Sequence, residues 1–555
     1  MPPFPLSIWH QVKVWWYGTY HRNKNCTRML PLPYYWMKAP LVLLCLLLWD
    51  GSAQAWSTAK PHCTDHTGQG ASNRQRTLVS STALEAQEEP KRDVSTLIEW
   101  AAFNGVETTN LSLEEADSLD GCVGVTASVD TPPMTNVLKV PSSLIFSSER
   151  IQQELETDFG HATDSAVQYI ESTQYRSQLS QFFLFVKVLM EHSKKQDSFW
   201  HPWFQSLPRT FDTAIAMSEE ELEWLPPFAW ALANVERRHL VVFCQALQRL
   251  PDTIIPKSVK MDNELTKWAF QVVFTRAWRY PEEEEIQDGV QKEGYERCDI
   301  VPFGDMYELG EYRHRNHVST FHAVSIFALP HIRRFNHCSE KDLELDYDEK
   351  DNFLAYTAHA VRAGAPLHIS YGRPTNPYRF LTIFGFCDTG MPEMFSQITL
   401  ETPTKRHQEM GYDLDTMVFR SKDGAIANAV WDVLLYTILE QKPDLQKRFY
   451  EAHKRGDVET KGKLHELFHL ESCLTLKSHV DRTHTEMKEI LRKMDEATDA
   501  EKLQNSRYAL IRRNNEFVLG VFTMVKQRVD GMIEAEVVRR RNDISSTRST
   551  SRTPN

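Results

Sequence analysis

The sequence predicts an α+β protein: a β-rich domain, split by a helical insert, is followed by an all-α domain. Two observations support this prediction. Apolar and polar residues alternate in 123–128, 136–146 and 367–371, as they do in half-buried strands. In most of 150–265 and 400–540, apolar residues recur at the three- and four-residue spacing of amphipathic helices. A chain of 555 residues is long enough for two or three domains.

Composition limits the class of protein. The content of hydrophobic residues, 41%, and of aromatic residues, 11%, suits a large core. The net charge of −12 argues against a dedicated nucleic-acid binder, which normally carries a basic stripe. The nine cysteines include no C-x-x-C pair. We therefore expect no zinc site, no disulfide framework and a reducing final compartment.

The N-terminal part has the pattern of a secretory signal peptide. Residues 37–55 comprise a short basic start with Lys38, an apolar run at 39–49 and a small-residue cleavage site ending at Ala55. A run of about 11 apolar residues is too short for a bilayer, which needs roughly 20, so we expect no stable membrane span after cleavage. Residues 1–36 fit no targeting pattern and are interpreted as a doubtful N-terminal extension.

The segment 56–92 is interpreted as transit-like and disordered. As far as Leu84 it is rich in Ser, Thr and Ala, and Asp65 is its one acid. A signal peptide followed by such a segment resembles the bipartite presequence that routes proteins into plastids of secondary origin. The alternative is a disordered linker on a lumenal or secreted protein.

Turn residues delimit the first helix and the strands. Residues 94–105 have the spacing of a short amphipathic helix, which Gly105 ends. Pro132 and Pro133 form a turn between the first two alternating segments. The acidic run at 344–349 is interpreted as a solvated hairpin turn rather than a metal site.

The predicted insert combines helices with an aromatic loop. Residues 179–192 read as a largely apolar helix, and 198–208 read as an aromatic loop closed by its final proline. At 217–225, Ser218 is followed three residues later by Glu221, which is the pattern of a capping box at a helix start.

The last third of the sequence predicts a helical bundle. The expected helical segments are 423–441, 443–456, 461–494 and 505–537. Residues 541–555 form a basic stretch without apolar periodicity, which predicts a disordered tail.

Short motifs follow one another in a fixed order within 336–386. They are Asn336-His337, then G-x-x-L-x-x-x-Y-G from Gly364 to Gly372, then Asn376, and finally Phe384-Gly385-Phe386. Their order and spacing resemble the SET domain of protein methyltransferases, in the branch of the Rubisco large-subunit methyltransferase and the actin histidine methyltransferase. The resemblance covers about 94–540. It implies a SET domain at 93–390, split by the helical insert at 150–265, and an all-α substrate-binding domain at 400–540.

The resemblance implies S-adenosylmethionine (AdoMet) as cofactor and assigns site residues. Tyr371 matches the catalytic tyrosine at the point of methyl transfer. The positions that match cofactor-binding residues are Gly124, Glu149, Arg276, Asp305, Met306, Asn336, His337 and Phe384. Residues 267–278 are expected to form an apolar helix, in which Arg276 is the one cation beyond the first residue, Lys267. Arg276 matches an arginine that can hold the AdoMet carboxylate. Phe384 stands where the family usually has tyrosine and can still stack on adenine.

The resemblance also reveals an unusual insertion. The family motif P-x-x-D-M-x-N-H is continuous, whereas here residues 307–334 separate its two halves, 302–306 and 335–337. We interpret the insertion as retained intron sequence, because its removal restores the motif. The competing alignment takes 330–333 as the first half and places Arg333 where the family has aspartate.

Methyl transfer to an amine requires a neutral amine lone pair aligned with the methyl group and shielded from water. The resemblance implies an AdoMet-dependent protein-lysine N-methyltransferase acting on a non-histone protein, and a plastid location because the plastid stroma contains AdoMet. The alternatives are a protein-histidine methyltransferase and a non-catalytic SET-like scaffold that binds a partner protein. His359 and His368 match no ligand spacing and are assigned no role.

Overall fold

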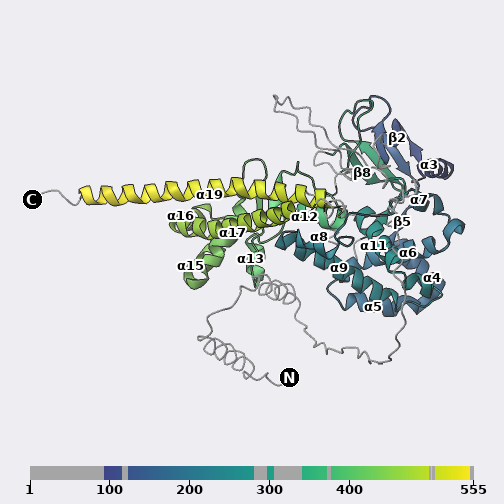
Figure 1. Cartoon of the computed structure of the whole chain (residues 1–555), viewed down its shortest axis with the longest axis horizontal. Coiled ribbons are helices and arrows are strands. Elements are labelled where there is room, and N and C mark those ends of the chain that lie inside the picture. Colours follow the sequence, from purple (N-terminus) through teal and green to yellow (C-terminus); the bar gives the residue numbers. More distant parts are fainter. Residues whose placement is uncertain are drawn as a thin grey trace, which may run out of the picture. The chain divides into compact units, whose positions relative to one another are not determined.

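The computed structural model describes residues 93–115, 123–279, 297–304, 341–369, 371, 377–498, 502, 505 and 507–550. It consists of small antiparallel sheets and many helices, which confirms the predicted α+β class (Figure 1). Except for 400–402, the described residues belong to one compact unit. The predicted signal peptide, the transit-like segment and the insertion at 307–334 lie outside the described residues.

The strands pair residues that are far apart in the sequence. Their bounds are β1 (Glu107–Thr108), β2 (Leu111–Glu115), β3 (Val123–Ala127), β4 (Asn136–Val140), β5 (Phe146–Ser147), β6 (Ala277–Arg279), β7 (Cys298–Ile300), β8 (Leu343–Tyr347) and β9 (Phe353–Thr357). One sheet has the order β1-β4-β9-β8, another has the order β5-β7-β6, and β2 pairs with β3. Val140 lies opposite Phe353, and both side chains are buried, so this register is fixed by the core.

The acidic run at 344–349 lies in a hairpin, as predicted. Tyr347 of β8 pairs with Phe353 of β9, and the turn between them is held by Asp348. The Asp348 carboxylate accepts hydrogen bonds from the Asn352 side-chain amide (2.8 Å) and from the backbone N–H groups of Asn352 (3.0 Å) and Lys350 (2.8 Å). These bonds lower the pKa of Asp348 to about 2. The described residues contain no cluster of His, Cys, Asp or Glu side chains that could hold a metal ion.

Helices occupy the chain between β5 and β6. Together with the first helix their bounds are α3 (Val94–Phe103), α4 (Ser148–Phe159), α5 (Asp164–Glu171), α6 (Leu179–Ser193), α7 (His201–Ser206), α8 (Glu219–Glu223), α9 (Pro227–Leu247), α10 (Lys257–Lys260) and α11 (Asn263–Arg276). Their apolar faces meet in an aromatic core, where the rings of Phe182 and Phe243 lie 5.3 Å apart, and those of Phe243 and Phe270 lie 5.5 Å apart. The predicted capping box is present: Ser218 accepts from the Glu221 N–H, and Glu221 accepts from the Ser218 N–H.

The aromatic loop predicted at 198–208 is wrong in its centre, where His201–Ser206 form α7. Pro202 lies in the first turn of this helix, where the absent N–H breaks no helical hydrogen bond. Trp203 and Phe204 are buried in the core. Tertiary packing of these two side chains therefore favours a helix that the local sequence does not indicate.

Two predicted boundaries also differ from the structure. The helix expected over 267–278 ends at Arg276, and Ala277–Arg279 form β6 instead. The segment 367–371 was expected to be a strand, but its described residues form no regular ladder. The Leu367 N–H donates to the Val125 carbonyl (3.0 Å), and on the other side the carbonyl of residue 368 accepts from the N–H groups of both residues 342 and 343. Two backbone donors thus share one acceptor, which interrupts strand pairing.

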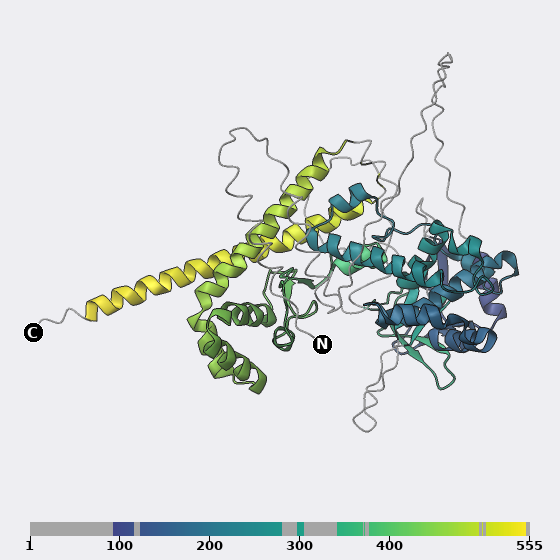
Figure 2. The same ribbon diagram turned by 90° about the horizontal axis from the view of Figure 1, so that it is seen from below.

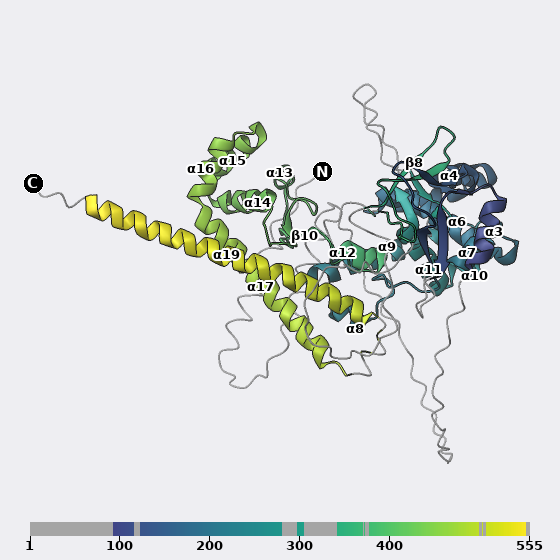
Figure 3. The ribbon, with the colours of Figure 1, turned by 90° about the horizontal axis from the view of Figure 1, so that it is seen from above.

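The C-terminal region is helical, as predicted. Its elements are α12 (Pro377–Arg379), the short π-helix η7 (Phe380–Phe384), β10 (Glu393–Phe395), α13 (Lys405–Glu409), β11 (Val418–Arg420), α14 (Asn428–Ile438), α15 (Pro443–Arg455), α16 (Val458–Leu467), α17 (His469–Glu496) and α19 (Tyr508–Thr550). Helices α17 and α19 pack against each other and cross (Figures 2 and 3). Leu476 and Val480 of α17, and Phe522 and Val525 of α19, are fully buried. The helix expected at 461–494 is divided into α16 and α17 at Phe468.

Helix α19 is longer than the sequence predicts. It continues to Thr550, so the expectation of a disordered tail is wrong for 541–550. Arg539 and Arg540 each donate a hydrogen bond of 2.8 Å to Glu536, and pairs at this spacing stabilise a helix. In the part of the chain that the structure describes, no helix has the length and hydropathy needed to cross a membrane.

Candidate functional site

An aromatic cluster surrounds Tyr371, the predicted catalytic residue. Tyr371 is half-buried, and the centre of its ring lies 4.8 Å from that of Phe384 and 6.1 Å from that of Phe386. Trp278 of β6 meets the same ring edge-on at 6.4 Å, with an angle of 82° between the planes. The fold therefore brings three separate stretches of the sequence together at one tyrosine.

The positions of Phe384 and Phe386 depend on the glycine between them. Gly385 ends η7 with φ of +78°, a left-handed conformation that glycine adopts without strain. A Cβ atom at this position would lie 2.7 Å from the carbonyl carbon of Asp212 and 2.9 Å from the Thr213 nitrogen. The two backbones are also joined by a hydrogen bond of 2.9 Å from the N–H of residue 214 to the carbonyl of residue 382. The loop 212–214 thus supports the turn that directs both rings toward Tyr371.

Helix α19 also contributes to this support. Arg507, next to the first residue of the helix, lies 3.3 Å from the Asp212 carboxylate and 3.3 Å from the Glu221 carboxylate, and it donates to the Phe211 carbonyl at 2.9 Å. Further along α19, Phe517 packs against the buried cluster of Phe380, Phe386 and Met391. The last helix is therefore bound to the loop and to the aromatic layer behind Tyr371.

A buried thiol near the cluster is not a nucleophile. Cys387 follows Phe386 and is fully buried. Burial raises the pKa of the Cys387 thiol to about 12. The thiol is consequently protonated at neutral pH, and a protonated thiol does not act as a nucleophile.

Two buried polar groups lie two residues apart where α11 passes into β6, the strand that carries Trp278 to the cluster. Arg276 is buried, with 8% of its surface exposed, at the C-terminal end of α11, where the helix dipole favours a cation. The Trp278 Nε1–H is buried and makes no hydrogen bond within the described residues. A buried donor without an acceptor costs about 1–3 kcal/mol, so a polar ligand atom would relieve this cost. A buried guanidinium, a buried N–H and an aromatic face fit the carboxylate and adenine of AdoMet.

The remaining predicted cofactor residues are less completely described. Gly124 lies in β3, opposite Glu114 of β2, and β3 continues beside the segment that leads to Tyr371. Glu149 is exposed in the first turn of α4, and within the described chain it makes no hydrogen bond to Arg276 or Tyr371. The last four candidates, Asp305, Met306, Asn336 and His337, lie outside the described residues.

Sequence reasoning missed Trp278. The residue belongs to no motif, and its only sequence signal is its place two residues after Arg276. Its relation to Tyr371 requires the strand pairing of β6 with β7, which tertiary structure alone determines.

The carboxyl group of Glu236 should make the stability of the protein depend on pH. Burial of Glu236 in α9 raises its pKa from 4.5 to about 7, although Arg379 acts in the opposite direction. The folded state favours the protonated carboxyl. The contribution of Glu236 to the free energy of unfolding is therefore fully present below pH 4.5 and is lost as the pH rises through 7, by at most about 3 kcal/mol. We expect Glu236→Gln to remove this fall, so that its melting temperature exceeds that of the wild type at pH 8 but not at pH 4.5.

Thermal melting of both proteins between pH 4.5 and 8 measures this difference. Glu220→Gln, at an exposed position of α8, serves as the control and should leave the pH dependence unchanged. A Glu236→Gln protein whose melting temperature follows that of the wild type across the range would contradict the prediction.

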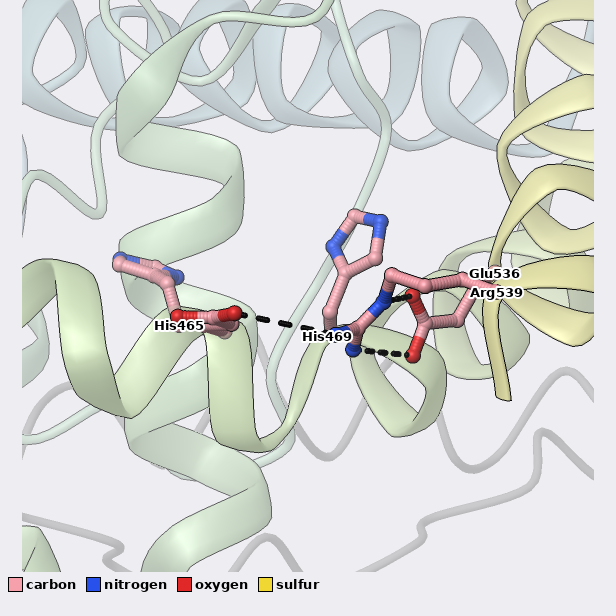
Figure 4. Close-up of a pocket in the computed structure, with 5 residues that line it drawn as sticks. His465, His469, Glu536 and Arg539 are labelled. Atoms are coloured by element: carbon pink, nitrogen blue, oxygen red, sulfur yellow. Dashed lines mark hydrogen bonds and ion pairs between the residues drawn. The ribbon is translucent and has the colours of Figure 1, made fainter. Parts of the chain in front are cut away.

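A separate cavity of about 290 Å³ lies in the C-terminal region (Figure 4). Its lining comprises His465, Glu466, His469, Glu536 and Arg539. Figure 4 shows Arg539 directed toward Glu536, to which it donates hydrogen bonds of 2.8 and 2.9 Å. The His465 Nε2 atom lies 2.8 Å from the Asp432 carboxylate. Because Arg539, Glu536 and His465 already bond to protein groups, we assign the cavity no catalytic role.

Comparison with known proteins finds similarity at the level of structure. No family model matches the chain, and no curated protein matches its sequence. A crystal structure of the SET domain of LSMT bound to lysine and AdoHcy is 16% identical, covers 80% of this chain and 92% of its own, and has a TM-score of 0.49. Rubisco LSMT bound to AdoMet is 17% identical with the same coverage and a TM-score of 0.49. Rubisco LSMT bound to sinefungin and monomethyllysine is 16% identical with a TM-score of 0.47. Similarity at this level does not by itself assign the chain to a family.

Proposed function

We propose that the protein is an AdoMet-dependent protein-lysine N-methyltransferase that acts on a non-histone protein. One observation carries the proposal: the tyrosine of the G-x-x-L-x-x-x-Y-G motif is half-buried against the phenylalanine of the G-F motif, at 4.8 Å, and against Trp278, at 6.4 Å. These residues are distant in the sequence, and their convergence is what a shared site requires.

The aromatic cluster can prepare a lysine for transfer. A lysine amine has a pKa of about 10.4 in water, so it arrives charged and must lose a proton before its lone pair can react. An apolar channel disfavours the charged form, and the rings of Trp278, Phe384 and Phe386 provide such a surface beside Tyr371. The phenol group of Tyr371 would orient the neutral amine by a hydrogen bond, and the surrounding rings would exclude water.

The cofactor would be held by residues on both sides of the cluster. Arg276 would bind the carboxylate of AdoMet, and the Phe384 ring would stack on its adenine. The backbone at Gly124 and the motif residues Asn336 and His337 complete the proposed set. When bound, AdoMet supplies the methyl group on a sulfonium, and the positive charge of that sulfonium further disfavours a charged amine.

Replacement of Arg276 tests the cofactor assignment. We expect Arg276→Leu to raise the dissociation constant for AdoMet by roughly 10- to 100-fold, because a charge-assisted hydrogen bond contributes about 1.5–3 kcal/mol. Isothermal titration of AdoMet into the purified protein measures this change. Lys267→Met removes a cation from the other end of the same helix and should bind AdoMet like the wild type. Unchanged affinity in Arg276→Leu would contradict the assignment.

The activity itself is tested by transfer of labelled methyl from AdoMet into proteins of a cell extract. The full chain and a version without 307–334 are compared, and mass spectrometry identifies the modified residue. Labelled lysine supports the proposal, whereas labelled histidine supports the alternative of a histidine methyltransferase. A protein that neither labels a substrate nor binds AdoMet would instead be the non-catalytic scaffold. Labelling only by the shortened version would support the interpretation of 307–334 as intron sequence.

We also propose a place of action, on the basis of the N-terminal composition. The signal pattern at 37–55 and the transit-like segment at 56–92 support delivery to a plastid of secondary origin. The requirement for AdoMet favours this compartment over the extracellular space. A lumenal or secreted protein is the alternative.

A further inference from the structure

One carboxylate connects three backbone segments close to Tyr371. The Asp342 Oδ2 atom lies 2.6 Å from the His368 ring Nδ1 and accepts the His368 backbone N–H at 2.9 Å. Its Oδ1 atom lies 3.1 Å from the Nε2 atom of His359. In the backbone, the Asp342 N–H donates to the carbonyl of His368 at 3.0 Å, and the Asp342 carbonyl accepts from the N–H of Ala358 at 2.8 Å. Asp342 therefore joins the start of β8, the end of β9 and the segment 366–369.

The bond between Asp342 and His368 is shielded from water. Only 7% of the His368 side chain and 17% of the Asp342 side chain are exposed, whereas 54% of the His359 side chain is exposed. Hydrogen bonds to a charged group are stronger than neutral ones, and they strengthen further where water is excluded. The contact with His368 is thus the dominant interaction of this carboxylate, and the contact with His359 is peripheral.

The side-chain contact adds to backbone hydrogen bonds on both sides of this segment. The N–H groups of Gly364 and Leu367 donate to β3, and the carbonyl of His368 accepts from residues 342 and 343. The backbone N–H of His368, however, bonds to the Asp342 carboxylate and not to a backbone carbonyl. The side chain of Asp342 therefore contributes to the register of the segment against β8. A slip of one residue in an extended segment would turn each side chain to the opposite face.

The contact between Asp342 and His368 also bears on the face of the segment on which Tyr371 lies. Leu367 and Ile369, on either side of His368, are buried in the core with 1% and 2% exposure. In extended backbone, residues two apart share a face, so Leu367 and Ile369 share one face while His368 points the other way. Tyr371 packs against the same core as Leu367 and Ile369 and contacts Trp278 and Phe384. Holding His368 in place therefore supports the position of Tyr371.

We propose that Asp342 and His368 are positioning residues that fix the register of the segment carrying Tyr371 and thereby set the rate of methyl transfer. The inference rests on the proposed methyltransferase function and adds residues that no motif identifies. It proposes a role for His368, to which no role was assigned from the sequence.

Two substitutions at His368 distinguish the effect of losing the hydrogen bond to Asp342 from the effect of changing the volume of the side chain. His368→Leu keeps an apolar group of similar length but removes the ring donor, whereas His368→Asn retains an amide donor close to the position of Nδ1. We expect His368→Leu to lower kcat by about 10-fold or more, with KM values for AdoMet and the protein substrate changed by less than about 3-fold, because misplacement of a reacting group lowers the rate of the step it serves. His368→Asn should restore most of kcat.

A double substitution identifies the group through which His368 acts. In a protein that already carries Tyr371→Phe, His368→Leu should lower the residual labelled-methyl transfer by less than about 2-fold, because residues that act as a unit are not additive. His359→Asn, on the other oxygen of the same carboxylate, is the control and should leave kcat unchanged. Two results would overturn the positioning role. One is that His368→Leu lowers methyl transfer by the same factor with and without the Tyr371 hydroxyl. The other is that His368→Leu alone is fully active while the wild type is active. A wild-type protein without transferase activity would overturn the proposed function itself, and the positioning role with it.

Discussion

Tyr371→Phe is expected to lower the rate of methyl transfer by roughly 100-fold or more, because removal of one preorganised hydrogen-bonding group at a reacting centre costs about that factor. The Tyr371 ring contacts Trp278, Phe384 and Phe386, and phenylalanine preserves those contacts. The loss should therefore fall on kcat, while the dissociation constant for AdoMet and the melting temperature stay near those of the wild type. Labelled-methyl transfer, titration of AdoMet and thermal melting measure these three quantities.

Tyr378→Phe is the matched control. Tyr378 lies in α12, is fully buried, and bonds through its hydroxyl group to Gln397. The same chemical change there should cost about 1 kcal/mol of stability, the usual contribution of one hydrogen bond, and should leave kcat within a factor of about three. An unchanged rate in Tyr371→Phe would show that the phenol has no part in the reaction and that the proposed mechanism is wrong.

Gly385→Ala adds a single methyl group, and we expect it to lower both the stability of the protein and the rate of methyl transfer. The added Cβ would lie 2.7 Å from the Asp212 carbonyl carbon, which is backbone, so one of the two segments must move. Steric strain of this kind and the left-handed φ of +78° together should cost about 3 kcal/mol or more. Because Phe384 and Phe386 flank Gly385, their rings should shift away from Tyr371, and kcat should fall by about 10-fold or more.

Gly456→Ala separates backbone strain from steric overlap. Gly456 follows α15 with a similar φ of +67°, but a Cβ there would have no heavy atom within 4 Å. This variant should lose only about 1 kcal/mol and retain full activity. Chemical unfolding and labelled-methyl transfer of the two variants provide the comparison. Equal stability losses in the two would indicate that the contact with Asp212 is not rigid, and that the turn is held by other groups.

Local patterns in the sequence predicted the elements that local chemistry controls. The capping box at Ser218 and Glu221 and the apolar helix α6 were predicted from residue spacing, and the β8–β9 hairpin from its acidic run. Each depends on contacts between residues close together in the chain, so short sequence windows contain the necessary information. The predictions failed where distant residues decide the structure, as in α7, where burial of Trp203 and Phe204 outweighs the loop-like composition.

The candidate site was predicted only in part. Motif order identified Tyr371, Phe384 and Arg276, and the structure brings Tyr371 and Phe384 into contact. The assignments at Asp305, Met306, Asn336 and His337 remain predictions, because these residues lie outside the described chain.

By itself, the sequence determined the α+β class and its helical C-terminal region, together with the identity of the central tyrosine, because these follow from periodicity and from a short motif. Tertiary structure alone decided what surrounds that tyrosine. Trp278 reaches Tyr371 through β6, and the His368 ring lies against the Asp342 carboxylate. The residues in such contacts are far apart in the sequence, and no motif relates them. The contacts therefore form only when distant strands pair and the core packs.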